Sequence, residues 1–183
     1  MARPGNRKAA APQLSHVDER GRARMVDVSA KPVTDREAVA RGRIHMQPQT
    51  LRLIRSGKIA KGEVLAVARV AGIIAAKRTA ELIPLCHPLA VEVAAVDFTV
   101  RGRGTLEIQA RVKVSGKTGV EMEALTAVSA AALTVYDMCK AVDREMVIGE
   151  IRLIEKRGGR SGEFRRRQEP RPGLKSRADA SLR

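Results

Sequence analysis

The stretch TLEIQARVKVSGKTGVEMEALTAVSAAALTVYDMCKAVD at residues 105–143 decides the fold of this chain. Residues 105–114 alternate strictly between apolar and polar side chains, which predicts a strand with one buried face. Residues 118–143 predict a long helix, and Thr118 and Glu121 at its start have the spacing of a capping box. The apolar side of the strand consists of Leu106, Ile108, Ala110, Val112 and Val114, and the polar side of Glu107, Gln109, Arg111 and Lys113.

The segments around this unit supply three more strands and two more helices. A short glycine-containing connection, RGRG, joins two of the strands and predicts an antiparallel hairpin. A shift in the apolar phase across Gly149 predicts a bulge at Gly149 and Glu150. The order β-α-α-β-β-α-β predicts an α+β sandwich of the ferredoxin-like type, with helices on one face of an antiparallel sheet. The further strands are predicted at 36–46, 91–100 and 146–156, and the helices at 47–59 and at 61–83, ended by Pro84.

The positive charge of the chain is concentrated at its two ends. The formal net charge is +15 over 183 residues. Residues 1–24 carry six basic and two acidic residues, and residues 156–183 carry ten basic and three acidic residues. These Pro-, Gly-, Ser- and Arg-containing ends are typical of disordered segments. The middle of the chain is therefore a mildly basic globular domain.

Composition narrows the classes of function. The chain has no Trp, one Tyr and two Phe, whereas proteins that bind single-stranded nucleic acids usually stack bases on aromatic side chains. A ferredoxin-like nucleic-acid-binding module with basic tails remains the alternative hypothesis. The sequence has neither an apolar run that could span a membrane nor the apolar core of a signal peptide, so we expect a cytoplasmic protein. Cys86 and Cys139 show no metal-ligand spacing with each other or with a histidine.

Both ends of the long helix carry charged residues that folding alone does not explain. Asp137 and Lys140 are three positions apart and share a face. The neighbouring residues are apolar, and a desolvated lysine there can fall in pKa and transfer protons. Glu123 and Asp137 are 14 positions apart, about 21 Å along a helix. If both are functional, the ligand is long or the site is built from two subunits.

Three loops combine glycine with basic residues: RSGKIAKGE at 55–63, SGKTG at 115–119 and EKRGGRSGEF at 155–164. The middle loop is not a complete phosphate loop, because Arg111 stands where the first glycine would be. A Gly-Lys-Thr turn that opens a helix can still bind an anion through backbone N–H groups. Together the loops suggest a polyanionic small molecule as ligand.

Several strings resemble the molybdenum cofactor biosynthesis protein C family, the cyclic pyranopterin monophosphate synthases. They are MVDVSAKP (25–32), KGEVLAVARVAGIIAAKRTAELIPLCHPL (61–89), GKTGVEMEALTAVSAAALTVYDMCKAVD (116–143) and MVIGEIRLIEKRGGRSG (146–162). The resemblance runs from about Leu14 to Phe164. It divides the chain into a disordered basic extension at 1–13, a synthase domain at 14–164 and a disordered Arg-rich tail at 165–183.

The resemblance implies a phosphorus–oxygen lyase with a ferredoxin-like fold. Its substrate would be (8S)-3′,8-cyclo-7,8-dihydroguanosine 5′-triphosphate, and its products cyclic pyranopterin monophosphate and diphosphate. The family implies no resident cofactor and no protein-bound metal. It also implies a homohexamer, a trimer of dimers with active sites at the dimer interface, and neither a membrane nor a specific nucleic acid as partner.

The resemblance also assigns residues by matching position. Asp137 matches the active-site acid, and Lys140 and Lys61 are similar to the essential lysines. Our hypothesis is that the two lysines act as acid and base while Asp137 orients a charged lysine. The matching substrate-binding positions are Leu85, Cys86 and His87 in one segment and Met122 and Glu123 in a second, with Glu121, Lys77, Lys156, Lys31 and Arg36 in other matching strings. In this assignment Cys86 packs and His87 contributes a hydrogen bond.

Overall fold

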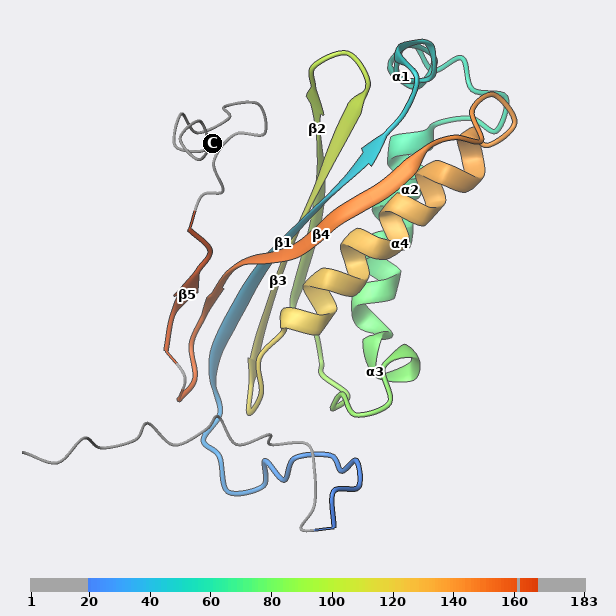
Figure 1. The fold of residues 1–183 in the computed structure, drawn as a ribbon. Coiled ribbons are helices and arrows are strands. Elements are labelled where there is room, and N and C mark those ends of the chain that lie inside the picture. Colours follow the sequence, from blue (N-terminus) through green and yellow to red (C-terminus); the bar gives the residue numbers. More distant parts are fainter. Residues whose placement is uncertain (1–19, 161, 168–183) are drawn as a thin grey trace, which may run out of the picture.

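The fold is an antiparallel sheet with helices on one face, as the sequence predicts (Figure 1). The computed structural model describes residues 20–160 and 162–167. The predicted extension at 1–13 and the tail beyond residue 167 lie outside the described residues. The sheet has the order β2-β3-β1-β4-β5, and every neighbouring pair is antiparallel. Its strands are β1 (Thr34–His45), β2 (Val93–Arg101), β3 (Thr105–Gly116), β4 (Val147–Arg157) and β5 (Phe164–Arg165).

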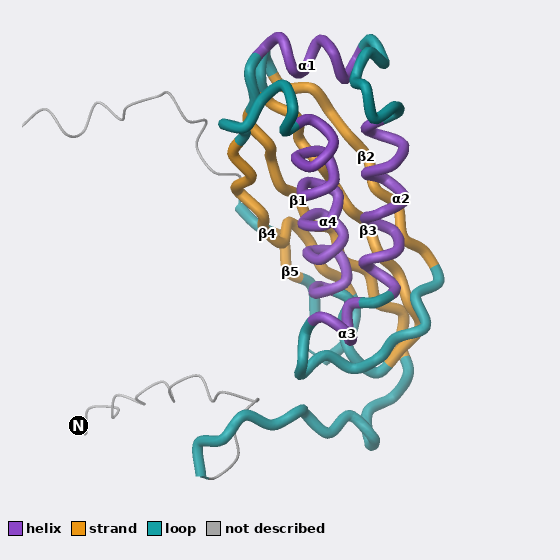
Figure 2. Tube along the Cα trace, turned by 90° about the vertical axis from the view of Figure 1, so that its right-hand side faces the viewer, coloured by secondary structure: helices purple, strands orange, loops and turns teal. Residues whose placement is uncertain are grey.

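Two long helices run side by side along the sheet, and two short helices lie at opposite ends of the layer (Figure 2). The long pair is α2 (Val64–Lys77) and α4 (Glu121–Cys139), and the short ones are α1 (Pro48–Arg55) and α3 (Thr79–Leu82). The single helix predicted over 61–83 is therefore two helices, divided at Arg78.

The core lies between β3 and α4. The predicted apolar side of β3 is confirmed, because all five of its residues are buried. They face a series of small residues on α4, which let the helix approach the sheet closely. Gly72 on α2 serves the same purpose between the helices, since a Cβ there would lie 2.9 Å from the Ala127 carbonyl oxygen. The buried residues of α4 include Ala124, Ala127, Val128, Ala131 and Val135.

The predicted bulge in β4 is confirmed. Arg43 pairs with Gly149 while Arg41 pairs with Arg152, so two residues of β4 face one residue of β1. Glu150 adopts a positive φ of 53°, a conformation that non-glycine residues rarely take. A second irregularity farther along the same strand pair, between Val39 and Ala40, was not predicted.

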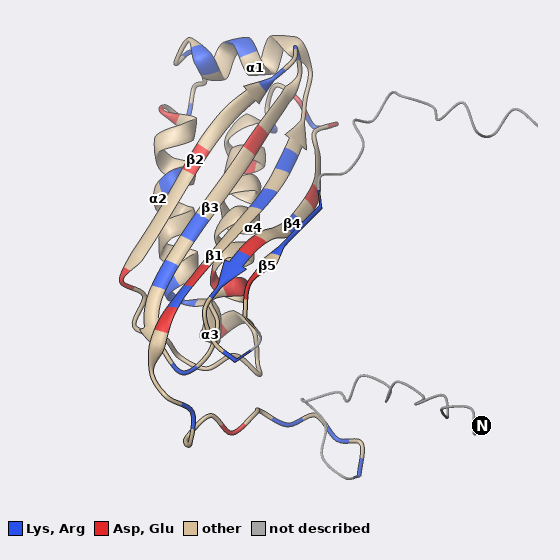
Figure 3. Cartoon of the chain, turned by 90° about the vertical axis from the view of Figure 1, so that its left-hand side faces the viewer, with Lys and Arg blue, Asp and Glu red and all other residues tan. Residues whose placement is uncertain are grey.

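Charged residues are spread along the strands of the sheet (Figure 3), and several of them form ion pairs with a residue on a neighbouring strand. Glu37 contacts Arg111 and, at 3.2 Å, Lys113. Glu107 binds Arg101 at 2.9 Å on its other side. Three of the four polar residues predicted to face outward on β3 therefore form ion pairs, and the fourth, Gln109, accepts a hydrogen bond from Arg41 Nε at 2.8 Å. The aromatic Phe98 of β2 is instead partly buried against the core, with the Arg69 guanidinium 5.6 Å from its ring centroid.

The predicted capping box is wrong. The residue before α4 is Val120, and no side chain caps the helix start. Thr118 lies within the turn that precedes the helix, two positions too early to cap it. The carboxylate of Glu121 instead folds over Gly119, where a Cβ would contact it. None of the described helices is both long and apolar enough to cross a membrane.

Candidate active site

Asp137 anchors a cluster of charges at the C-terminal end of α4. Its Oδ1 lies 2.7 Å from Lys140 Nζ, and its Oδ2 lies 2.8 Å from Lys61 Nζ. Lys61 belongs to the loop between α1 and α2, and its ammonium group also donates to the Asp137 carbonyl oxygen at 3.0 Å. The structure thus brings together the three residues predicted to be catalytic.

The electrostatics of this cluster favour fully charged groups. Hydrogen bonds from Lys140 and Lys61 lower the pKa of Asp137 to about 2. The same contact raises the pKa of Lys140. The sequence suggested the opposite shift for a lysine in an apolar turn, and that expectation is wrong because Lys140 is half exposed and paired with a carboxylate. In this arrangement the Lys140 ammonium group can act as a proton donor.

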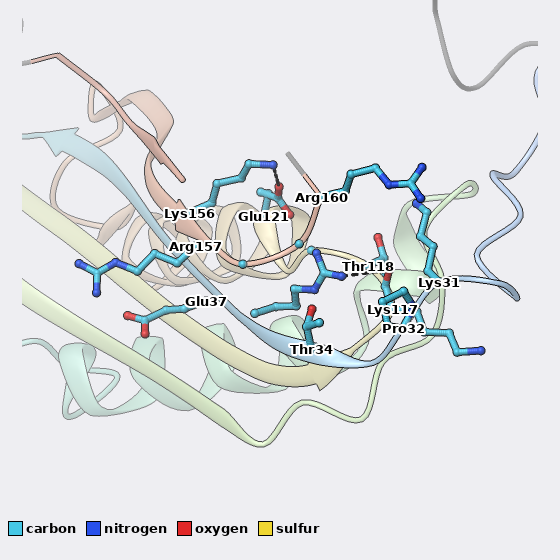
Figure 4. Close-up of a pocket in the computed structure, with 14 residues that line it drawn as sticks. Lys31, Pro32, Thr34, Glu37, Lys117, Thr118, Glu121, Lys156, Arg157 and Arg160 are labelled. Carbon is cyan, nitrogen blue, oxygen red and sulfur yellow. Dashed lines mark hydrogen bonds and ion pairs between the residues drawn. The ribbon is translucent and has the colours of Figure 1, made fainter. Parts of the chain in front are cut away.

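A large cationic cavity lies at the opposite end of α4 (Figure 4). Its volume is about 720 Å³, and three segments far apart in the sequence line it. These are residues 31–37 at and before the start of β1, residues 117–121 between β3 and α4, and residues 156–160 at and after the end of β4. The basic residues that line it are Lys31, Arg36, Lys117, Lys156, Arg157 and Arg160.

Backbone groups hold Arg36 in place within this cavity. Its Nε donates to the Gly116 carbonyl oxygen at 3.3 Å, and its Nη2 to the Lys117 carbonyl oxygen at 3.5 Å. Its guanidinium occupies the space beside Gly159, where a Cβ would collide with it. Across the cavity, Lys156 Nζ lies 3.1 Å from Glu121 Oε1, as Figure 4 shows. The cations are therefore positioned by the fold before any ligand binds.

A second cavity of about 360 Å³ adjoins the first and shares Lys31, Thr118, Gly119 and Glu121 with it. His87 Nε2 lies 2.8 Å from the Val26 carbonyl oxygen. Because a carbonyl oxygen only accepts hydrogen bonds, Nε2 carries the proton and Nδ1 of the neutral ring is an acceptor. Five predicted binding residues line this cavity together: Leu85, Cys86, His87, Met122 and Glu123.

Two buried or half-buried groups in this second cavity have raised pKa values. Burial, and to a lesser extent the charge of Glu123, raises the pKa of the Cys86 thiol, which suits a packing role better than a nucleophilic one. Burial and the nearby Glu121 raise the pKa of Glu123 to about 7. Glu123 also lines a small third cavity of about 110 Å³, together with Lys77. It is therefore placed to exchange a proton near neutral pH.

The predicted site residues thus form two groups rather than one. The ten predicted binding residues gather in the three cavities near the start of α4, and the three predicted catalytic residues lie at its other end. Two of the three glycine-rich basic loops line the cationic cavity, while the loop at 55–63 supplies Lys61 instead. Among the residues described, no group of three or more His, Cys, Asp and Glu side chains could hold a metal ion. The cavity is also lined by residues that the sequence did not assign individually to the site: Thr34, and Lys117, Gly158, Gly159 and Arg160 of the two loops.

Comparison with known proteins assigns the family. The model of the MoaC family matches residues 25–159. The chain belongs to the MoaC family. The matched range includes every predicted site residue at both ends of α4, and it excludes residues 1–24 and 160–183, to which β5 belongs.

Curated relatives that match the chain are named cyclic pyranopterin monophosphate synthase. The protein of Desulfitobacterium hafniense is 66% identical over 152 residues, which cover 83% of this chain and 93% of the relative. That of Chloroflexus aggregans is 68% identical over 157 residues, covering 85% and 95%. The protein of Parvibaculum lavamentivorans is 62% identical over 157 residues, covering 85% and 98%. The similarity therefore spans nearly the whole length of these members of the MoaC family.

Proposed function

We propose that this chain is a cyclic pyranopterin monophosphate synthase of molybdenum cofactor biosynthesis. As a phosphorus–oxygen lyase it converts (8S)-3′,8-cyclo-7,8-dihydroguanosine 5′-triphosphate to cyclic pyranopterin monophosphate and diphosphate. Relatives that are 62% to 68% identical over most of the chain carry this name. A substrate derived from a nucleoside triphosphate also favours a cytoplasmic location.

One structural observation carries the proposal: the cationic cavity adjoins a cavity of mixed polarity and shares four lining residues with it. The first is lined by six Lys and Arg residues, which can bind the phosphate groups of the substrate. The second offers apolar walls together with His87 and Glu123, which can hydrogen-bond the polar edge of a purine-derived ring. A ligand with a polyanionic end and a polar heterocyclic end fits this pair of cavities.

The reaction requires several proton transfers and the departure of diphosphate. In the proposed mechanism Lys61 and Lys140 give and take protons while Asp137 orients them through its two oxygens. Once one lysine has given up its proton, it can serve as a base in a later step. The cations around Arg36 neutralise the charge that develops as diphosphate leaves.

We propose further that each active site combines two subunits. Asp137 and Glu123 lie about 21 Å apart along α4, so one substrate cannot contact both in one chain. A two-fold, antiparallel arrangement of two α4 helices would place the Asp137 end of one chain beside the Glu123 end of the other. Exposed apolar residues on the outer side of the helix layer support this contact, and the complete assembly would be a hexamer. These residues are Val67, Val70, Ile74 and Leu133.

The test of the activity is a turnover assay with the purified chain and the cyclised guanosine triphosphate. We expect diphosphate and the fluorescent oxidised pterin to appear together, and both to be lost in Lys61→Ala. Folded protein that releases neither product would overturn the proposed function.

Subunit complementation tests the composite site. Lys61→Ala disables the Asp137 end of every composite site, and Arg36→Ala disables the end that contains the cationic cavity. Chains mixed at equal amounts, unfolded and refolded together should regain about a quarter of the wild-type activity, because half the dimers then carry one intact site of two. Sites formed within single chains would regain none. The molecular mass in solution checks the oligomer independently.

A further inference from the structure

Thr34 carries an unusual hydroxyl group at the first position of β1. Among the described residues, its Oγ1 is the one buried side-chain nitrogen or oxygen atom with no hydrogen-bond partner. Buried hydroxyl groups are normally hydrogen-bonded, because burial without a partner destabilises the folded chain. Thr50 and Thr79 follow this rule, since their hydroxyls donate to Asp143 Oδ2 at 3.0 Å and to the Ala75 carbonyl oxygen at 3.1 Å.

The position of Thr34 explains what partner its hydroxyl can take. Thr34 lines the cationic cavity, and Figure 4 shows its side chain among the basic residues. Lys and Arg side chains only donate hydrogen bonds, so they cannot accept one from Thr34. The two carboxylates of this cavity are engaged elsewhere: Glu37 binds Arg111 and Lys113, and Glu121 binds Lys156. Neither carboxylate is therefore paired with Thr34, and the oxygen of a ligand bound in the cavity can supply the acceptor.

The backbone places Thr34 on the same side of β1 as Arg36, a cation of the cavity that two backbone carbonyl oxygens hold in position. Thr34 pairs with Gly116 in the sheet register, and Arg36, two residues along the same strand, donates to the carbonyl oxygen of Gly116. Residues two apart on a strand point to the same face. The Thr34 hydroxyl and the Arg36 guanidinium are thus presented on one side of β1, toward the same space.

We propose that the Thr34 hydroxyl donates a hydrogen bond to a phosphate oxygen of the substrate that Arg36 also binds. This inference rests on the proposed function and adds a binding residue to it. In the free chain the hydroxyl has no partner. In the complex the oxygen of an anion, and not a neighbouring side chain, accepts its hydrogen bond.

The test compares Thr34→Val, which keeps the shape of the side chain, with Thr34→Ser, which keeps the hydroxyl. Inorganic diphosphate serves as the probe in calorimetric titration, and KM and kcat are measured with the cyclised guanosine triphosphate. We expect the ligand-free Thr34→Val chain to be at least as stable as the wild type in thermal unfolding. Its diphosphate affinity should fall, and its KM rise, by about ten-fold or more, the usual effect of losing a hydrogen bond to a charged group. Thr34→Ser should bind almost as the wild type does.

Thr50→Val is the matched control, because it removes a buried hydroxyl that already has a partner. It should lower stability and leave the diphosphate affinity unchanged. A Thr34→Val chain that binds diphosphate like the wild type, or that loses stability without ligand, would overturn the inference while wild-type turnover still supports the proposed function. A wild-type chain that neither turns over substrate nor binds diphosphate would refute the proposed function itself.

Discussion

Lys61 Nζ lies 2.8 Å from Asp137 Oδ2, although the two residues are 76 positions apart in the chain. The loop after α1 folds back over the end of α4 and brings them together. A third residue, Lys140, binds the other oxygen of the same carboxylate. One carboxylate therefore positions two ammonium groups that come from different elements.

Replacement of either lysine should lower the activity of the chain without lowering its stability. Lys61 and Lys140 side chains are 49% and 53% exposed, and exposed ion pairs contribute little to folding. We expect Lys61→Ala and Lys140→Ala to lower kcat by about 100-fold or more, the typical effect of removing a general acid or base. Their unfolding temperatures should stay close to that of the wild type. Lys58→Ala, on the same loop, is the control and should keep its activity.

The buried carboxyl of Glu123 should make stability depend on pH. Burial raises its pKa from 4.5 to about 7, so between these values the folded chain binds a proton that the unfolded chain has lost. The free energy of unfolding therefore falls as the pH rises through this range. We expect Glu123→Gln to remove that loss and to be more stable than the wild type above pH 7 by up to roughly 3 kcal/mol. Urea unfolding across this pH range measures the difference.

Glu81 offers a control of opposite sign. Its hydrogen bond with Arg78 lowers its pKa, so its contribution to stability is present above the unfolded-state pKa and is lost as the pH falls. Glu81→Gln should therefore be slightly less stable than the wild type at neutral pH, and the difference should shrink in acid. If Glu123→Gln were less stable than the wild type at neutral pH, as we expect for Glu81→Gln, then burial of the Glu123 carboxyl would not be the cause of the pH dependence of stability.

The sequence predicted those features that depend on local spacing. The alternation in β3 has a period of two, and a strand is the only regular structure that buries all five of its apolar residues on one face. Asp137 and Lys140 were likewise found from their spacing on a helix. The capping box failed because the same spacing fits a turn that comes before the helix. β5 is only two residues long and leaves no periodic pattern.

The cationic cavity could not be predicted in full, because the sheet register creates it. Thr34 lies opposite Gly116, and Gly158 and Gly159 lie against Asp35 and Arg36, far from them in sequence. A lone threonine before a strand gives no signal of function. The basic loop at 155–164 did give one, since its glycines and arginines are unusual for the end of a strand.

Asp143 should be important for stability and also for the Lys61 loop. Only 3% of this residue is exposed, and it accepts hydrogen bonds from the Gln47 backbone N–H at 2.8 Å and from Thr50 Oγ1 at 3.0 Å. It thereby connects the start of α1, the helix that leads to Lys61, to the segment that follows Lys140. Asp143→Ala would leave the buried Thr50 hydroxyl and the partly buried Gln47 N–H unpaired, and we expect it to lower the free energy of unfolding by about 1–3 kcal/mol. Urea unfolding checks this, and Asp143→Asn, which keeps an acceptor oxygen, should lose less.

The two glycines at the end of the described chain allow a sharper test of the cationic cavity. Gly159 and Gly162 both have positive φ, 81° and 66°, so alanine at either position carries a similar backbone strain of about 1 kcal/mol or more. Only at Gly159 would a Cβ collide with the Arg36 guanidinium, whereas Gly162 has open space around it. We therefore expect both variants to lose similar stability, but Gly159→Ala alone to displace Arg36 and raise KM by about ten-fold, the loss of one charge-assisted hydrogen bond. Equal KM values for the two variants would show that the position of Arg36 does not matter for substrate binding.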